Sequence, residues 1–288
     1  DNDVFAIFGP VYSGSIMVSM AESKRGEVPN FTGGEAAAIT AQGNPYVFRT
    51  AFGQNISYPK LAKFINGKYK TLAIIYANND FGKGGRDTMT KLMEGSATKV
   101  VADISTDAGA VDFSAAVLKA KQSDADAIFI VTNEEESARM LREFRKQGVK
   151  KPLIGETTLI GQKVIELAGD AANGALGHVG LTVEAAPLKA FGAKYKTEYK
   201  SESDHNGIKG YTGMYVLKAA IEKVGKLDRK AVAAAIRGGC FSAKQTPGVL
   251  MDVCFDDKGD LDRESFMVEV KGGHQVVTAT LPPLNAKK

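Results

Sequence analysis

The fold class is decided by residues 71–93, which read TLAIIYANNDFGKGGRDTMTKLM. The run Thr71 to Tyr76 is apolar and has the length of a buried strand, and Gly82 to Met93 has the pattern of a helix. The loop Ala77–Gly82 lies between them. A strand that leads through a short loop into a helix is the unit from which parallel α/β sheets are built.

The same alternation of strand and helix continues along most of the chain. Further strands are expected at residues 4–8, 28–31, 46–49, 99–104, 127–132, 152–155 and 175–179. Further helices are expected at residues 15–25, 36–41, 58–64, 113–122, 135–147, 160–168, 187–199, 207–224 and 228–237. The last portion differs, because two strands at 248–255 and 266–271 are joined by a polar turn at 256–260. The pattern predicts the α/β class with parallel sheets.

The composition is that of a soluble globular protein large enough for two domains. The 288 residues are 44% hydrophobic and 24% charged. No window approaches the ~18 consecutive apolar residues of a membrane span. The net charge of +4 is spread without a dense basic run, so a nucleic-acid partner is not expected. The first residues do not read as a secretory signal, and we expect that any signal peptide has been removed or lies outside this sequence.

The two cysteines, Cys240 and Cys254, are separated by a segment that contains Pro247 and Gly248. This spacing is compatible with a hairpin closed by a disulfide, which would stabilise the fold by about 3 kcal/mol and indicate an oxidising compartment. Two unpaired buried cysteines are an equally good interpretation. The sequence leaves the choice between them open.

Binding residues in open α/β sheets gather in the loops at the carboxyl ends of the strands. Four such loops have distinctive sequences, at residues 9–15, 32–35, 77–82 and 132–136. The first places small residues and the hydroxyl of Ser13 at the start of a helix. Unpaired backbone N–H groups there favour an anion such as a carboxylate, so Ser13 is a candidate ligand hydroxyl. Alternatively, Ser13 or Ser15 only caps the helix.

Several motifs follow one another in a recognisable order. They are the Gly9-Pro10 loop, GNPYVFRT at residues 43–50, DFS at 112–114 and FDDKGD at 255–260. In order and spacing they resemble the leucine/isoleucine/valine-binding protein family, the periplasmic receptors of ABC importers of the branched-chain amino-acid type. The resemblance covers essentially the whole chain, which makes it more specific than any single motif.

The resemblance implies a type I periplasmic binding fold, in which two similar doubly wound parallel-sheet lobes are joined by a three-stranded hinge. Lobe I would comprise residues 1–53 plus 181–266, and lobe II residues 54–180 plus 267–288. About 60 residues of such a fold, two βαβ-scale elements, would precede Asp1. We therefore expect N-terminal elements, with their ligand contacts, to lie outside this sequence.

The same resemblance implies binding and transport rather than catalysis. The protein would be an extracytoplasmic substrate-binding protein, periplasmic or tethered outside the cytoplasmic membrane. It would capture a small amino acid or related carboxylate in an interlobe cleft by hinge closure. Its expected partners are that small-molecule ligand and an ABC transporter membrane permease, and it would act as a monomer. The alternative is a ligand-sensing domain of a regulator or receptor with the same fold.

In lobe I the resemblance assigns two loops to the ligand. They consist of Val11, Tyr12, Ser13, Gly33, Gly34 and Glu35. Ser13 matches the family's carboxylate-binding position, Tyr12 replaces a smaller residue, and Glu35 replaces a threonine. An acid at position 35 argues against an ordinary aliphatic amino acid as the ligand.

In lobe II the resemblance places an aromatic residue that covers the ligand on Phe81 and a second aromatic position on Asn133. The acid that pairs with the ligand's ammonium group falls on Thr157, directly after Glu156. Three acids are candidates to replace it, namely Glu35, Glu134 and Glu156. Each can equally be a solvated acid of a loop or of a helix start. The choice between an amino acid and an aromatic or other organic acid stays open.

Motifs of other function classes are weak. The glycines of residues 81–86 fit neither a dinucleotide fingerprint nor a phosphate loop. His178, His205 and His274 lie far apart without metal-ligand spacing, and Ser13 lacks the first glycine of a nucleophile elbow. We therefore expect no metal site, no cofactor and no enzyme activity.

Overall fold

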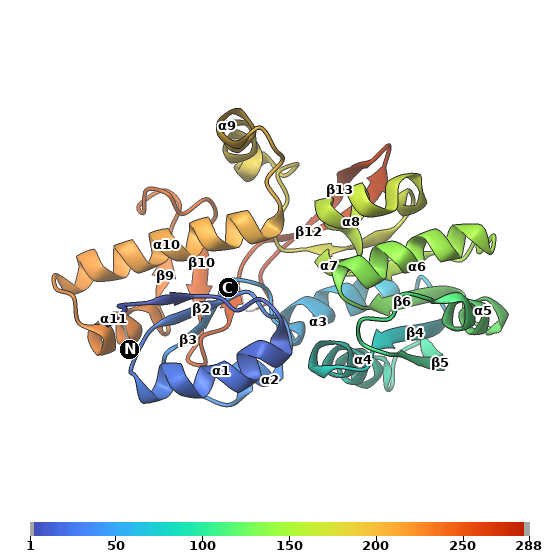
Figure 1. Cartoon of the computed structure of the whole chain (residues 1–288), viewed down its shortest axis with the longest axis horizontal. Coiled ribbons are helices and arrows are strands. Elements are labelled where there is room, and N and C mark those ends of the chain that lie inside the picture. Colours follow the sequence, from blue (N-terminus) through green and yellow to red (C-terminus); the bar gives the residue numbers. More distant parts are fainter. Residues whose placement is uncertain (1–2, 285–288) are drawn as a thin grey trace. The chain divides into compact units, whose positions relative to one another are not determined.

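The computed structural model describes residues 3–284, which fold into two compact α/β units (Figure 1). The first unit contains the residues up to Ile56, Ala186–Glu264 and the residues from Pro282. The second contains Ser57–Ala185 and Ser265–Leu281. The boundaries expected after residues 53, 180 and 266 lie after residues 56, 185 and 264, and the chain returns to the first unit at Pro282. The expected lobes did not include that return.

The second unit is built around one seven-stranded sheet with the strand order β13-β12-β8-β7-β6-β4-β5. Its parallel strands are β4 (Thr71–Ala77), β5 (Lys99–Thr106), β6 (Ala127–Val131), β7 (Leu153–Gly155) and β8 (Leu176–Val179). Its antiparallel edge consists of β12 (Ser265–Lys271) and β13 (His274–Leu281). The helices are α3 (Gln54–Ile65), which begins in the first unit, α4 (Asp80–Met93), α5 (Ser114–Gln122), α6 (Glu134–Lys146), α7 (Thr157–Ile160) and α8 (Gln162–Ala168).

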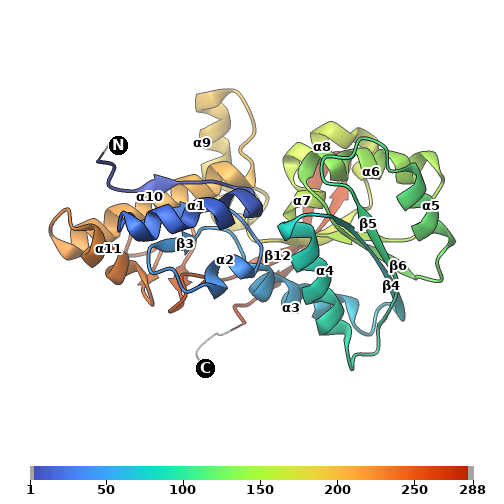
Figure 2. The same cartoon turned by 60° about the horizontal axis from the view of Figure 1, so that its bottom comes forward.

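Burial explains the continuous apolar runs of this sheet. Strand β6 is buried at every residue, and β4 at every residue after Thr71. Figure 2 shows α4 on one side of these strands and α5 and α6 on the other. Parallel strands with helices on both faces have no solvent-facing side, so they do not alternate apolar and polar residues. Tyr58 of α3 packs edge-on against Phe129 of β6, with ring centroids 5.3 Å apart.

The first unit contains two small sheets. The parallel sheet has the order β1-β2-β3 and consists of β1 (Ile7–Phe8), β2 (Asn30–Thr32) and β3 (Val47–Arg49). The antiparallel sheet consists of β9 (Cys240–Phe241), β10 (Val253–Phe255) and β11 (Leu261–Asp262). The helices are α1 (Ser13–Arg25), α2 (Ala38–Ala41), α9 (Lys189–Tyr199), α10 (His205–Val224) and α11 (Arg229–Ile236).

The cysteines lie in the antiparallel sheet of the first unit. Cys240 of β9 is directly opposite Cys254 of β10, and the two form a disulfide. Of the two interpretations that the spacing left open, the structure therefore shows the bridged one. The bridge joins β9 to β10 within this sheet. The aromatic core around Phe48 and Phe255, whose rings meet edge-on at 6.1 Å, packs the sheet against the rest of the unit.

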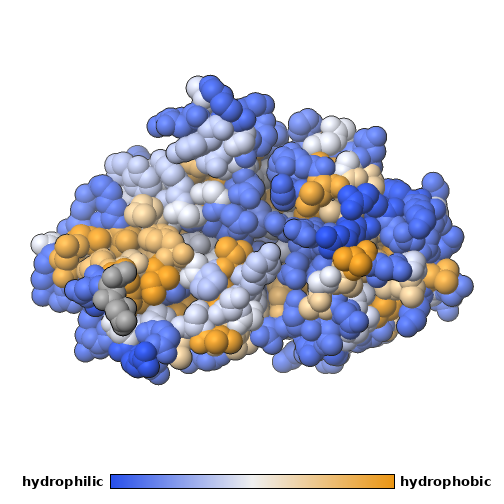
Figure 3. Space-filling model, viewed as in Figure 1, coloured by the Kyte–Doolittle hydropathy of each residue, from blue (hydrophilic) through white to orange (hydrophobic). Residues whose placement is uncertain are grey.

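The surface of the first unit is partly apolar. Figure 3 shows apolar side chains gathered on the face that carries β1 and α11. Val4, Phe8 and Leu227 are exposed large apolar residues of this unit. Among the described residues 3–284, β1 is an edge strand whose sheet partner is β2. Within residues 3–284, no helix has both the length and the apolar character needed to cross a membrane.

Two expected elements differ most from the observed ones, and strand β13 was not expected. The strand expected at 248–255 is only β10, because turns occupy most of the segment between β9 and β10. The helix expected at 160–168 is divided at Gly161 into α7 and α8. Strand β13 was not predicted, because most of its residues are exposed and it lacks an apolar run. It returns from β12 through Gly272 and Gly273, whose φ angles of 57° and 79° suit a tight turn.

Candidate functional site

The carboxyl ends of β1 and β2 bring two of the predicted ligand loops together. These strands are parallel neighbours, so both end at the same edge of the sheet. Hydrogen bonds then join the loops, because Gly33 N–H donates to the Pro10 carbonyl over 3.4 Å and the Thr32 hydroxyl donates to the same carbonyl over 2.9 Å. The residues predicted in lobe I therefore form one group in the first unit.

Ser13 links the two loops. It is the first residue of α1, is only 4% exposed, and its hydroxyl oxygen accepts a hydrogen bond from Ala36 N–H at 3.2 Å. The N-cap residue of α1 is Tyr12, whose side chain is 67% exposed and makes no capping bond. Ser13 is thus not the helix cap of the alternative interpretation. The first N–H groups of α1 lack a side-chain cap and remain suited to an anion.

Gly34 of the second loop allows a close approach of α1 and α2. A Cβ atom on Gly34 would lie 2.3 Å from Cδ1 of Ile16 and 3.1 Å from the carbonyl oxygen of Val11. A Cβ atom on Gly33 would lie 3.7 Å from both Val11 Cγ atoms and 3.7 Å from Cδ of Lys209. Gly34 is therefore required by packing, whereas Gly33 lies in ordinary contact distance of its neighbours.

Lys209 of α10 is a cation of this group that the sequence analysis did not single out. Its Nζ lies 3.5 Å from Oε1 of Glu35 and 3.5 Å from the carbonyl oxygen of Gly33. The side chains of Lys209 and Glu35 are only 9% and 13% exposed, so water screens this ion pair poorly. Ile208 and Thr212 are buried on the same helix. A lysine among such buried positions is the sequence signal that could have found it.

A buried ion pair fixes the shape of the loop after β2. Arg49 of β3 is fully buried, and its Nε donates to Oδ1 of Asp260 over 2.6 Å. Its Nη1 donates to the carbonyls of Gly34 and Ala36 over 2.6 and 3.1 Å. The Thr40 hydroxyl closes the network by donating to Oδ2 of Asp260 over 2.6 Å. The motifs GNPYVFRT and FDDKGD therefore meet at this pair, and together they position a predicted ligand loop.

In the second unit, the predicted residues follow three neighbouring parallel strands. The strand order β7-β6-β4 places the loops after these strands side by side at one edge of the sheet. Phe81 is buried at the start of α4, after β4. Asn133 precedes α6 and Glu134 begins it, after β6. Glu156 precedes α7 and Thr157 begins it, after β7, and both are buried.

Local hydrogen bonds hold the loops of the second unit. Oδ1 of Asn79 accepts from Gly82 N–H over 2.8 Å at the start of α4, and the Glu136 carboxylate accepts from Asn133 N–H over 2.8 Å at the start of α6. A Cβ atom on Gly82 would lie 2.0 Å from the carbonyl oxygen of Ala77. Only glycine therefore permits the tight passage from β4 into α4.

Glu156, a candidate partner for a ligand ammonium group, lies beside a buried histidine. Its Oε2 is 3.0 Å from Nδ1 of His178, which belongs to the adjacent strand β8. Both side chains are almost completely buried. His178 was considered only as a metal ligand in the sequence. A histidine inside the short strand LGHV is the signal that could have identified it as a partner for a buried acid.

A protein-family model described as Periplasmic binding protein matches residues 1–275, which include both groups of residues. The chain belongs to the periplasmic binding protein family. This match covers almost the entire length of the two units, so the family includes the chain as a whole rather than one of its parts.

Relatives of this periplasmic binding protein confirm the resemblance to leucine/isoleucine/valine-binding proteins. A leucine-, isoleucine-, valine-, threonine- and alanine-binding protein of Pseudomonas aeruginosa is 29% identical over 236 residues, which are 81% of this chain and 62% of that protein. The Leu/Ile/Val-binding protein BraC3 of Rhizobium johnstonii is 27% identical over 278 residues, which are 95% of this chain and 74% of that protein. The chain thus spans less than two thirds of the first relative.

Solved structures confirm the type I periplasmic binding fold. A leucine-binding protein, LivK, from Thermotoga maritima matches with a TM-score of 0.85 and 24% identity, over 97% of this chain and 80% of that one. A solute-binding protein of an ABC transporter from R. palustris, in complex with benzoate, matches with a TM-score of 0.87 and 21% identity, over 98% and 79% of the two chains. Because the identities to these two structures are only 24% and 21%, the similarity establishes the fold alone.

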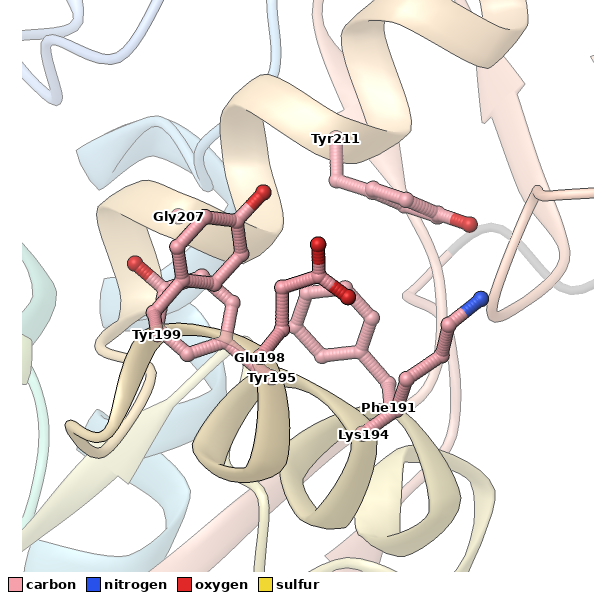
Figure 4. Close-up of a pocket in the computed structure, with 7 residues that line it drawn as sticks. All are labelled: Phe191, Lys194, Tyr195, Glu198, Tyr199, Gly207 and Tyr211. Carbon is pink, nitrogen blue, oxygen red and sulfur yellow. The ribbon is translucent and has the colours of Figure 1, made fainter.

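This periplasmic binding protein also has a cavity of about 480 Å³ between α9 and α10 in its first unit, which the sequence did not predict (Figure 4). The rings of Phe191 and Tyr211 line it with centroids 4.9 Å apart. A hydrogen bond to Tyr215, followed by burial, raises the pKa of Tyr211 above its usual value. Phe191, Tyr195 and Tyr199 recur every four residues on α9, so packing of α9 against α10 is sufficient to explain them.

Proposed function

We propose that this protein is the extracytoplasmic substrate-binding component of an ABC importer, with a small amino acid or a related carboxylate as its ligand. Membership of the family supports a binding role, and two relatives are named for the amino acids that they bind. The Cys240–Cys254 disulfide supports a location in an oxidising compartment. The protein would act as a monomer and deliver its ligand to the membrane permease of the transporter.

The observation that carries the proposal is the group of hydrogen-bond donors at the carboxyl ends of β1 and β2. The Ser13 hydroxyl, the uncapped N–H groups at the start of α1 and the Lys209 ammonium all belong to it. Each of these groups favours a carboxylate as its partner. The remaining ligand contacts are proposed to come from the second unit, through Phe81, Asn133, Glu134, Glu156 and Thr157.

Binding is proposed to be coupled to hinge closure of the two units. A ligand shifts such an equilibrium only by its difference in affinity for the open and closed states. A ligand that gains contacts with both units on closure binds the closed state more tightly than the open state. The permease would then distinguish the loaded protein from the empty one by its closed state.

Ligand-dependent thermal stabilisation of the full-length protein tests the proposal. The panel contains amino acids together with small aliphatic and aromatic carboxylates. A ligand present at 100 times its Kd is expected to stabilise the native state by about 2.7 kcal/mol. Ser13→Ala is expected to weaken binding about tenfold, because it removes one hydroxyl contact to the carboxylate.

Ser15→Ala is the matched control, since Ser15 is exposed on the same helix two residues further on. Its affinity for the ligand should equal that of the unmodified protein. The proposal is contradicted if no member of the panel raises the melting temperature, or if the two alanine variants bind the ligand equally well.

A further inference from the structure

Lys209 is a buried cation placed against the loops that the proposed function assigns to the ligand carboxylate. Its aliphatic part lies beside Gly33, on the side that Val11 also contacts. Its Nζ has the Gly33 carbonyl and the Glu35 carboxylate as neighbours, each at 3.5 Å. Charge-assisted N–H···O hydrogen bonds are usually about 2.7–2.9 Å long. The ammonium group is therefore held loosely by these partners, and a carboxylate ligand could bind it at a shorter distance.

The same contact weakens Glu35 as a partner for a ligand ammonium group. The negative charge of Glu35 is partly compensated by Lys209 in a site with little exposure to water. An α-amino acid that placed its ammonium group against Glu35 would bring it close to the positive charge of Lys209. Like charges in a poorly screened site repel strongly, so this arrangement favours a ligand without the ammonium group.

The acids of the second unit also have structural partners. Glu156 is held by His178, and Thr157, at the position where the family resemblance expects the acid, carries no charge. Glu134 is the first residue of α6, where the positive end of the helix dipole stabilises a carboxylate. None of the three acids named from the sequence is thus placed solely to receive an ammonium group.

From this arrangement we infer that the ligand is a monocarboxylate that lacks an α-ammonium group, and that Lys209 is the residue that selects it. The inference rests on the proposed function and names the ligand class of the same site. Lys209 binds the ligand carboxylate together with Ser13 and the start of α1. Glu35 keeps Lys209 in place. The Lys209–Glu35 pair repels a ligand carboxylate less than Glu35 alone would.

Binding to matched pairs of compounds tests the inference by calorimetry on the full-length protein. The pairs are leucine with 4-methylpentanoate and phenylalanine with 3-phenylpropanoate, which differ only in the ammonium group, and benzoate is added as an aromatic acid. The deaminated member of at least one pair, or benzoate, is expected to bind about tenfold or more tightly than either amino acid. Tighter binding of leucine or phenylalanine overturns the inference but leaves the proposed function intact. Binding of no compound overturns both.

Variants at Lys209 of α10 and at Glu35 test whether Lys209 selects the ligand. Lys209→Met is expected to weaken carboxylate binding about tenfold to a hundredfold, while Lys218→Met, an exposed lysine of the same helix, leaves it unchanged. Because Lys209→Met strands a partly buried acid, the double variant Lys209→Met with Glu35→Gln removes both charges and preserves the fold. It should show the same loss of affinity. Equal carboxylate affinity in the double variant and the unmodified protein overturns the role of Lys209.

Discussion

The two units hold their proposed ligand loops by different means. In the first unit the loop after β2 is held by Arg49 and Asp260, a buried ion pair between residues 211 positions apart in the sequence. In the second unit the starts of α4 and α6, which follow the loops after β4 and β6, are capped by side chains three positions away in the sequence, those of Asn79 and Glu136. The contrast shows that similar loops at the ends of parallel strands can depend on distant or on local contacts.

The sheets explain why the units differ. The parallel strands of the first unit have two or three residues each, so few ladder hydrogen bonds and little apolar area hold their ends. The second unit has one sheet of seven strands, with β4 and β6 almost entirely buried. The large sheet supports the loops after β4 and β6 with local caps, whereas the short parallel strands of the first unit are supplemented by the buried contact between Arg49 and Asp260.

The largest expected effect comes from breaking the distant contact. Arg49→Met should destabilise the first unit by about 3–5 kcal/mol, because it leaves the buried Asp260 carboxylate without its cation. Hydrogen exchange measured by mass spectrometry should become faster in β2 and β3 while β4 and β6 keep their protection.

Arg139→Met is the matched control for that variant. Arg139 pairs with Glu135 on the surface of α6, and exposed pairs of this kind contribute about 1 kcal/mol or less. If Arg49→Met raised exchange equally in both units, or no more than the control does, the assignment of the buried pair to the first unit's stability would be wrong.

A smaller effect is expected from the disulfide. Replacing both Cys240 and Cys254 with serine should destabilise the first unit by about 3 kcal/mol, because the unfolded chain regains the freedom of the closed loop. Differential scanning calorimetry should show a lower melting temperature for this unit only. Reduction of the unmodified protein should reproduce the shift, and an unchanged melting temperature after verified reduction would argue against a stabilising role.

The smallest effect is expected from a local cap of the second unit. Asn79→Ala should cost about 1 kcal/mol, because Gly82 N–H loses its side-chain acceptor at the start of α4. Faster exchange should be confined to the first turn of α4, beside Phe81. Asn78→Ala, one residue earlier, serves as the comparison. Exchange that spread through β4 and β6 would show that the second unit depends on this cap as strongly as the first depends on Arg49.

Much of the fold could be predicted from the sequence because most of its strands and helices carry their own signals. Strands such as β4 and β6 are apolar runs without interruption, and the loops that follow them begin helices, so position in the chain also located the loops proposed to contact the ligand. Strand β13 was not predicted, because it is an exposed edge strand. Its pairing with β12 depends on the Gly272-Gly273 turn rather than on an apolar pattern.

The partners of the candidate site residues were harder to predict than the loops that contain these residues. Ser13 and Glu35 were found as loop residues, but the partner of Glu35 is Lys209, 174 positions later on a helix. His178 likewise reaches Glu156 from the neighbouring strand. Such pairings depend on which helices and strands become neighbours, and local sequence patterns do not determine that. The charge of each candidate acid could therefore be read from the sequence, but its availability to a ligand could not.

The ion pair between Arg49 and Asp260 has a consequence for how the protein matures. A chain emerging from the ribosome or from a translocation channel acquires Asp260 long after the loop that contains Gly34 and Ala36 has been synthesised. Until then the guanidinium group of Arg49 lacks its acid, and the carbonyls that it holds have no fixed position. If these loops bind the ligand as proposed, affinity for it is acquired only after Asp260 has been synthesised, late in the production of the chain.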